Sequence, residues 1–216
     1  MTTTNPHLTM PTVERGPAPA EADVVVVAVH GRSQSTDYLI EHLVDPIADE
    51  RICWLLPAAH GAVWYPVGFM APFADNQPQL DHSLAALDRI AAHLTAVPTT
   101  RVVWAGFSQG ACLVSEWVAR HPRRWGGLLA FTGGRIGPDG TDLAIDESAT
   151  GLEGMPAYFG VGARDTWVPL TRVEQTAAVY RAAGADVVLD VFDDALHEIR
   201  PGELDHARRV LHAARR

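Results

Sequence analysis

A nucleophilic serine is the first chemistry that the sequence suggests. Ser108 lies at the centre of a G-x-S-x-G pattern, Gly106-Phe107-Ser108-Gln109-Gly110. Residues 101–105 before it are typical of a buried strand, and residues 111–120 after it are typical of a helix. This context distinguishes a nucleophile elbow from an ordinary Gly-Ser turn, which is the alternative interpretation. Because the two glycines remove Cβ atoms that would clash where strand and helix nearly touch, the pattern predicts an exposed Ser108 hydroxyl.

The sequence also supplies the two partners that a serine nucleophile needs. An imidazole must take the hydroxyl proton, and a carboxylate must orient that imidazole. In open α/β sheets such residues follow the carboxyl ends of strands. Asp165 follows an apolar run at 157–161, and His197 follows another at 186–192. The chain order Ser, Asp, His is the order expected of this fold, so Ser108, Asp165 and His197 are the predicted catalytic residues.

Other acids and histidines are weaker candidates because of their positions. Asp193 and Asp194 also follow the last predicted strand, but they are so close to His197 that we expect them to shape its loop. His30 stands at a strand end, where we expect it to anchor a turn, and His60 begins an aromatic loop beside the predicted site. The remaining histidines fall in the N-terminal tail, on predicted helices or at helix ends: His7, His42, His82, His93, His121, His206 and His212.

An oxyanion formed by attack of Ser108 needs two N–H donors. The residue after the nucleophile, Gln109, is expected to supply one from its backbone. The loop after the first long strand contains His30-Gly31-Arg32, and we assign the second donor to the Arg32 backbone N–H. The Arg32 side chain is expected in solvent, with an anionic substrate group as the alternative.

Strands and helices alternate along the rest of the chain. The predicted strands lie at residues 23–30, 52–56, 101–105, 126–131, 157–161 and 186–192, and the predicted helices at 37–44, 81–96, 111–120, 169–183 and 203–215. This alternation favours an α/β fold with a mostly parallel central sheet covered by helices on both faces. Residues 1–22 are expected to form a loose N-terminal segment, with one short edge strand near residues 8–13. Residues 23–216 are expected to form a single catalytic domain without a large cap domain.

Composition limits the partners and cofactors. The net charge is −9 and no arginine-rich stripe occurs, which argues against nucleic acid as a partner. All 17 basic residues are arginine, which removes Schiff-base lysine chemistry and the phosphate-loop lysine. Cys53 and Cys112 have no metal-type spacing, and we expect neither metal nor cofactor. No apolar run reaches the length of a membrane span and no secretory signal is visible, so the cytoplasm is the expected location. The oligomeric state is open, and a dimer is compatible with the sequence.

At family level, the chain resembles the phospholipase/carboxylesterase family of α/β-hydrolases, which includes acyl-protein thioesterases and small bacterial carboxylesterases. The matching segments run in family order and end with the triad histidine: Val29-His30-Gly31, Trp64-Tyr65-Pro66, Gly106-Phe107-Ser108-Gln109-Gly110, residues 162–169 and His197-Glu198. The resemblance implies the same triad and the same oxyanion donors. The chain departs from the family after His30-Gly31, where Arg32-Ser33-Gln34-Ser35 replaces an apolar residue followed by Gly-Asp. Dienelactone hydrolases are related and use a cysteine nucleophile, but Cys112 lies inside the predicted helix, four residues past Ser108.

The expected function is hydrolysis of carboxylic esters with short to medium acyl chains, acting on a small-molecule ester substrate. Hydrolysis of thioesters is the first alternative, because both reactions pass through one acyl-enzyme. A non-catalytic ligand-binding member of the fold is the second, although all three triad positions are filled. Large apolar side chains near the predicted site are candidates for the acyl pocket, and each is equally compatible with the hydrophobic core: Trp64, Tyr65, Phe69, Met70, Phe73 and Trp167.

Overall fold

A computed structural model describes residues 4–145 and 150–215 of the 216-residue chain. Its centre is a seven-stranded sheet with the strand order β1-β3-β2-β4-β5-β6-β7, in which only β1 runs antiparallel to its neighbour. The strands are β1 Thr12–Arg15, β2 Val24–Val29, β3 Ile52–Pro57, β4 Val102–Phe107, β5 Gly127–Phe131, β6 Pro156–Gly162 and β7 Asp186–Phe192. The mostly parallel sheet confirms the predicted fold class.

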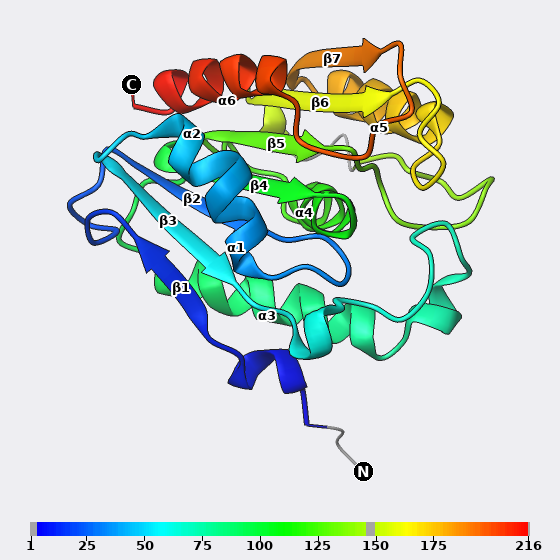
Figure 1. Ribbon diagram of the computed structural model, residues 1–216, viewed down its shortest axis with the longest axis horizontal. Helices are drawn as coiled ribbons and strands as arrows, with labels where there is room; N and C mark the ends of the chain where they lie inside the picture. Colours follow the sequence, from blue (N-terminus) through cyan, green and yellow to red (C-terminus); the bar gives the residue numbers. More distant parts are fainter. Residues whose placement is uncertain (1–3, 146–149, 216) are drawn as a thin grey trace.

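Helices cover both faces of this sheet (Figure 1). One face carries α3 Gln79–His93, α4 Gln109–Arg120 and α5 Leu170–Ala182. The other carries α1 Thr36–Leu39, α2 Asp45–Ile47 and α6 Pro201–Ala213. A π-helical turn, Ile40–Val44, joins α1 to α2, so the helix predicted for residues 37–44 continues to Ile47. Short 3₁₀ turns occur at Pro6–Thr9, His60–Ala62, Phe73–Asn76, Thr99–Arg101 and Thr150–Leu152.

The valine-rich strand β2 shows why the sheet lies between two helical layers. All six of its residues are buried. Side chains of a strand point alternately to opposite faces. Val25, Val27 and Val29 therefore enter the core beneath α3, α4 and α5, whereas the residues that alternate with them enter the core beneath α1 and α6. A continuous apolar run is what a central parallel strand requires.

The register of the parallel strands gathers their carboxyl ends at one edge. Val29 at the end of β2 pairs with Gly106 of β4, and Phe107 of β4 pairs with Phe131 at the end of β5. Gly162 at the end of β6 pairs with Phe192 at the end of β7. The loops that follow β2, β4, β6 and β7 therefore meet at this edge, which is where ligands bind in open α/β sheets.

The N-terminal segment is joined to the domain at several points. The edge strand β1 begins at Thr12, somewhat later than the sequence predicts, and it pairs with β3. Before it, the His7 side chain is buried, and its Nδ1 accepts the His60 backbone N–H at 3.1 Å. Arg89 of α3 also donates to the Leu8 carbonyl oxygen. Most of this described segment, from Asn5 to Arg15, therefore packs against the sheet and α3.

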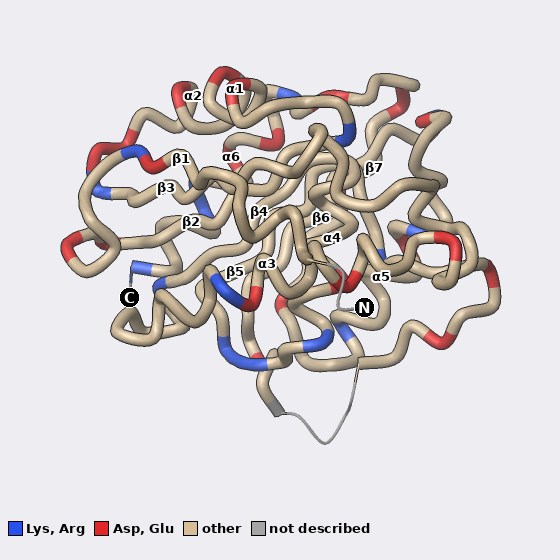
Figure 2. The backbone as a smooth tube through the Cα atoms, turned by 90° about the horizontal axis from the view of Figure 1, so that it is seen from below, with Lys and Arg blue, Asp and Glu red and all other residues tan. Residues whose placement is uncertain are grey.

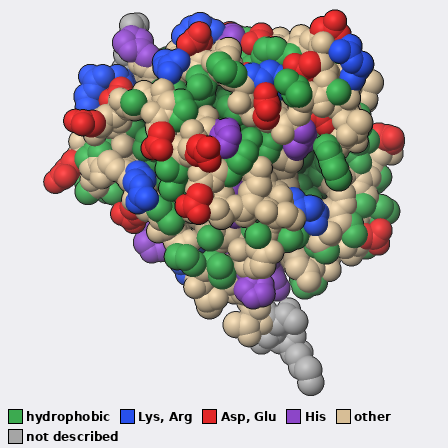
Figure 3. All heavy atoms as spheres, viewed as in Figure 1, with side chains coloured by type: hydrophobic (Ala, Val, Ile, Leu, Met, Phe, Trp, Pro, Cys, Tyr) green, Lys and Arg blue, Asp and Glu red, His purple; other side chains and the backbone are tan. Residues whose placement is uncertain are grey.

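The long connection between β5 and β6 contains little regular structure in its described part. Residues 132–145 form no helix or strand, in agreement with the irregular loop predicted for 132–155, and residues 146–149 of that loop lie outside the described residues. Acidic and basic positions are spread around the outside of the backbone (Figure 2), and apolar, acidic and basic side chains mix on the face shown in Figure 3. Among the described helices, none combines the length and apolar character that a membrane span requires.

Candidate active site

The turn between β4 and α4 places Ser108 at a sharp bend. Its backbone has φ 51° and ψ −117°, a conformation that residues with side chains rarely adopt. A Cβ atom on Gly106 would overlap the backbone of Gly110, and one on Gly110 would overlap the carbonyl oxygen of Val29. Both glycines of the motif are therefore required by close backbone approach. The α4 helix starts directly after Ser108, so unpaired N–H groups and the positive dipole end face the same point.

Ser108, His197 and Asp165 form a continuous hydrogen-bonded chain. His197 Nε2 lies 2.7 Å from Ser108 Oγ, and His197 Nδ1 lies 2.7 Å from Asp165 Oδ2. The Asp165 side chain is fully buried, and its other oxygen accepts the backbone N–H groups of Trp167 at 2.7 Å and Val168 at 3.0 Å. Since carboxylate oxygens accept, the Nδ1–H donates to Asp165 and leaves Nε2 free to accept the Ser108 proton. The geometry joins the three residues that the sequence singles out.

Charged side chains hold the loop that carries His197. Arg200 donates from Nη2 to Asp194 Oδ1 at 2.6 Å and to the Leu196 carbonyl oxygen at 2.7 Å, and from Nε to Asp194 Oδ2 at 3.1 Å. Behind it, the buried Glu203 carboxylate accepts the Arg200 backbone N–H at 2.8 Å. Burial raises the pKa of Glu203 to about 7. Asp194 thus shapes the His197 loop, as the sequence predicts.

Two side chains on the other side of Ser108 bind one segment of the chain. The Arg32 guanidinium donates to the carbonyl oxygens of Tyr65 at 2.7 Å, Pro66 at 2.9 Å and Val67 at 2.6 Å. The Gln109 side-chain amide accepts the Trp64 N–H at 2.9 Å and donates to the Tyr65 carbonyl at 2.8 Å. The expectation of a solvated Arg32 side chain is therefore wrong, because three backbone carbonyls take its hydrogen bonds. The two predicted oxyanion donors share the task of fixing residues 64–67, which we call the wall segment.

Buried His30 connects the loop after β2 to the start of this region. Its Nε2 accepts the Ala59 N–H at 3.0 Å, so its proton lies on Nδ1, which donates to the Gly31 carbonyl at 2.7 Å. The His30 carbonyl in turn accepts the Trp64 indole N–H at 2.9 Å. Burial lowers the pKa of His30, which keeps the ring neutral. These contacts give His30 the anchoring position that the sequence suggests.

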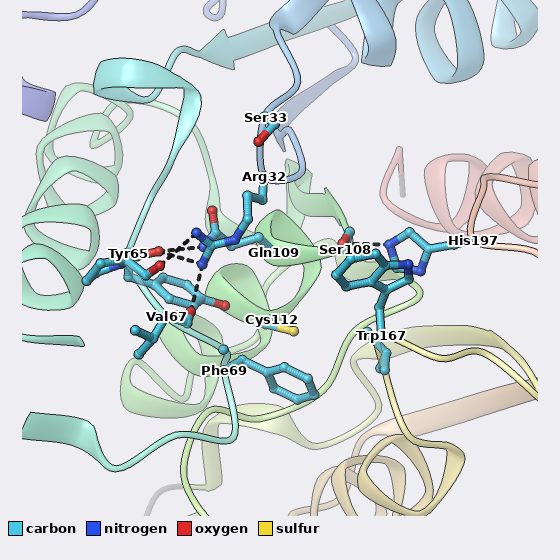
Figure 4. A pocket seen from close by; sticks show the side chains of 13 residues that line it. Arg32, Ser33, Tyr65, Val67, Phe69, Ser108, Gln109, Cys112, Trp167 and His197 are labelled. Carbon is cyan, nitrogen blue, oxygen red and sulfur yellow. Dashed lines mark hydrogen bonds between the residues drawn. The ribbon is translucent and has the colours of Figure 1, made fainter. Parts of the chain in front are cut away.

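A cavity of about 570 Å³ opens above Ser108 (Figure 4). Of the aromatic and apolar side chains proposed for the acyl pocket, Tyr65, Phe69 and Trp167 line it. Trp64 is instead fully buried beneath the loop after β2, and neither Met70 nor Phe73 belongs to the cavity lining; both pack against the core. The cavity is also lined by residues without a predicted site role, namely Ser33, Pro66, Val67, Gly68, Cys112 and Val168.

Cys112 lines the cavity, but its thiol is a poor nucleophile. Its side chain is 1% exposed, and burial raises the pKa of its thiol to about 12. A thiol is a nucleophile only as thiolate, so Cys112 is part of the apolar floor. Among the described residues, no group of three or more His, Cys, Asp or Glu side chains is placed to hold a metal ion.

In the loop that carries His197, Arg200 and Glu203 are further residues that sequence reasoning missed. Charged residues are usually exposed, and the sequence predicts only a helix at residues 203–215 in this part of the chain. One signal was available, because a residue that starts a helix is often bonded by a Glu three positions later. Arg200 and Glu203 have this spacing, and Pro201 marks the helix start.

Comparisons with known proteins identify the family and the fold of this chain. The sequence model of the family described as phospholipase/carboxylesterase matches residues 18–214. A phospholipase/carboxylesterase from Dyadobacter fermentans is 32% identical, with a TM-score of 0.86 over 94% of this chain and 97% of that one. A carboxylesterase from Bacillus cereus shares the fold at 17% identity, with a TM-score of 0.71 over 98% of this chain and 100% of that one. Acyl-protein thioesterase 2 from Zea mays shares it at 16% identity, with a TM-score of 0.73 over 96% of this chain and 100% of that one. No curated protein matches the chain in sequence.

Proposed function

Because this chain belongs to the phospholipase/carboxylesterase family, we propose that it is a serine hydrolase cleaving carboxylic esters with short to medium acyl chains. The observation that supports this most is the pair of 2.7 Å contacts joining Ser108 to His197 and His197 to Asp165. A cavity without a separate cap domain among the described residues suits soluble substrates of this size.

The reaction follows from the positions of these groups. Ser108 Oγ attacks the ester carbonyl carbon while its proton moves to His197 Nε2. The negative oxygen that forms accepts the backbone N–H groups of Arg32 and Gln109. His197 then gives its proton to the leaving alcohol as the carbon–oxygen bond breaks, which leaves an acyl group on Ser108. Water, activated by the same imidazole, releases the acid, and Asp165 holds the imidazole in its working tautomer throughout.

The test is kcat/KM of the purified protein on p-nitrophenyl acetate, butyrate, octanoate and palmitate, beside Ser108→Ala. Removal of the nucleophile is expected to lower the rate by roughly 10³- to 10⁶-fold. The cavity predicts an optimum at butyrate or octanoate rather than palmitate. Equal rates for wild type and Ser108→Ala would refute the proposal. A matched series of oxygen and thiol esters with one acyl group shows which of the two ester classes the enzyme prefers.

A further inference from the structure

Trp167 has an unusual position for its residue type. Its side chain is 74% exposed, the highest value among the large hydrophobic side chains of the described residues. It nevertheless lines the same cavity as Ser108 and His197. Exposed tryptophan is unfavourable in water, and an exposed aromatic ring on the rim of a reactive cavity is a candidate for ligand contact.

The backbone beneath this indole is firmly held. The buried Asp165 carboxylate accepts the N–H groups of both Trp167 and its neighbour Val168, at 2.7 and 3.0 Å. The Val168 side chain is 3% exposed and belongs to the core. Asp165 also binds His197, so one carboxylate fixes the position of the imidazole and of the residue that carries the indole. The ring therefore stands at a defined place relative to the imidazole.

The two sides of the cavity face different parts of an ester. In Figure 4, Arg32, Gln109, Tyr65 and Phe69 lie on one side of Ser108 and His197 lies on the other, and the Trp167 indole is drawn across Ser108 next to His197. The carbonyl oxygen must point to the donors on the first side. The leaving-group oxygen must come within hydrogen-bond reach of His197, because the imidazole protonates it. The alcohol part of the ester therefore extends past His197 toward Trp167.

We propose that Trp167 forms a stacking surface for the leaving alcohol, and that the enzyme prefers esters of alcohols carrying a planar aromatic ring. This inference rests on the proposed ester hydrolysis and adds the class of alcohol. A flat aromatic ring lies on the indole face in offset or edge contact and adds an attraction between the two ring quadrupoles, which an aliphatic ring of similar size lacks. The acyl group occupies the other side, against Tyr65 and Phe69. Preference for the alcohol and preference for the acyl chain can therefore be changed separately.

The experiment compares 2-phenylethyl acetate with 2-cyclohexylethyl acetate. Both form the same acetyl-enzyme, so a difference in kcat/KM reports on ester binding and acylation, the steps in which the alcohol takes part. Two methylene groups separate the ring from the reacting oxygen, so the electronic effect of the ring is small. Cyclohexyl is the more hydrophobic of the two, and simple burial would favour it. A preference for the phenyl ester therefore isolates stacking, and we expect roughly three- to tenfold in the wild type.

The variants separate this role from a structural one. Trp167→Leu should remove the phenyl preference and Trp167→Phe should keep most of it, and kcat/KM on ethyl acetate, measured for both variants, reports any loss that is independent of the ring. Phe69→Leu is the matched control, which should change the preference between acetate and octanoate while leaving the phenyl-to-cyclohexyl ratio unchanged. A wild-type ratio near one, or a ratio retained in Trp167→Leu, overturns the inference and leaves ester hydrolysis intact. Absence of Ser108-dependent hydrolysis of every ester overturns the proposed function and this inference with it.

Discussion

Two loops meet at Ser108, and they are held by different kinds of contact. On the oxyanion side, Arg32 and Gln109 bind backbone groups of the wall segment 64–67, and neutral His30 bonds to two more backbone groups. On the histidine side, Arg200 binds the Asp194 carboxylate and lies 3.6 Å from that of buried Glu203. The first arrangement depends on backbone shape, and the second depends on charge.

This difference predicts unequal sensitivity to solution conditions. Hydrogen bonds to neutral backbone carbonyls change little with pH or salt, whereas ion pairs depend on the protonation state of their members. The histidine side should therefore be the part of the site that responds to pH. Four substitutions, two of them with an exposed matched control, test this contrast.

Asp165→Asn should have the largest effect, because the Asp165 side chain is fully buried and binds the His197 imidazole directly. An amide in this position favours the wrong imidazole tautomer, and in a serine-protease triad that change lowers kcat by roughly 10⁴-fold. Steady-state kinetics on p-nitrophenyl butyrate measures it. Asp193→Asn is the control, since this side chain is 92% exposed and should leave kcat nearly unchanged. Comparable losses in the two variants would contradict the assignment of the acid.

Arg200→Met should destabilise the fold by about 3 kcal/mol, because it leaves the buried Glu203 and the Asp194 carboxylate without their cation. We also expect kcat to fall at least tenfold, since the loop that positions His197 loses its support. Urea unfolding and kinetics on the same ester measure the two effects. Arg164→Met removes the exposed Arg164–Asp193 pair and should change neither quantity noticeably. A folded, fully active Arg200→Met protein would show that the loop does not need the charge.

Glu203→Gln should change how stability varies with pH. The folded protein holds the Glu203 proton up to a pKa of about 7, whereas the unfolded chain releases it near 4.5. This contribution is therefore full below pH 4.5 and is lost as pH rises through about 7, by about 3 kcal/mol. Relative to wild type, Glu203→Gln should gain about that amount of unfolding free energy between pH 4.5 and 8. Urea titrations at several pH values measure it, and parallel pH profiles for the two proteins would exclude Glu203 as the source.

Arg32→Met should have the smallest effect of the four. It removes three hydrogen bonds to the wall segment, but the carbonyls of Pro66 and Val67 can turn to water, so stability should change by only about 1 kcal/mol. The loss should appear in kcat, by about tenfold, because a displaced oxyanion donor acts in the transition state. Arg32→Lys should recover part of it. If KM alone rises and kcat stays constant, the Arg32 side chain supports substrate binding through the wall segment and does not position the oxyanion donor.

The sequence predicted the strand ends that carry Ser108, Asp165 and His197 better than it predicted the residues that line the cavity. Ser108, Asp165 and His197 each follow a strand of the parallel sheet, and strand ends are readable from apolar runs and from the glycines of the elbow. Because the strands are parallel and in register, their carboxyl ends then meet at one edge of the sheet. The last strand, Asp186–Phe192, has the bounds that the sequence predicts.

The wall segment was predicted only in part, for a physical reason. Trp64 and Tyr65 are neighbours in an irregular loop, where side-chain direction follows no fixed period. Trp64 packs beneath His30, and Tyr65 lines the cavity. The opposite directions of these two side chains are set by the Gln109 side chain, which hydrogen-bonds to the backbone of both residues across 44 or 45 positions of sequence. The burial of Arg200 and Glu203 is likewise a tertiary property that local composition does not show.

The two cysteines have a practical consequence for following motions of this molecule. Cys53 lies in β3 and Cys112 in the first turns of α4, each is 1% exposed, and burial raises the pKa of their thiols to about 11 and about 12. Alkylating reagents react with exposed thiolate, so each thiol is labelled only when its own part of the chain opens. Labelling rates at the two positions therefore time the opening of the β1–β3 edge and of the catalytic helix separately. A compound bound in the cavity should slow labelling of Cys112 and leave that of Cys53 unchanged.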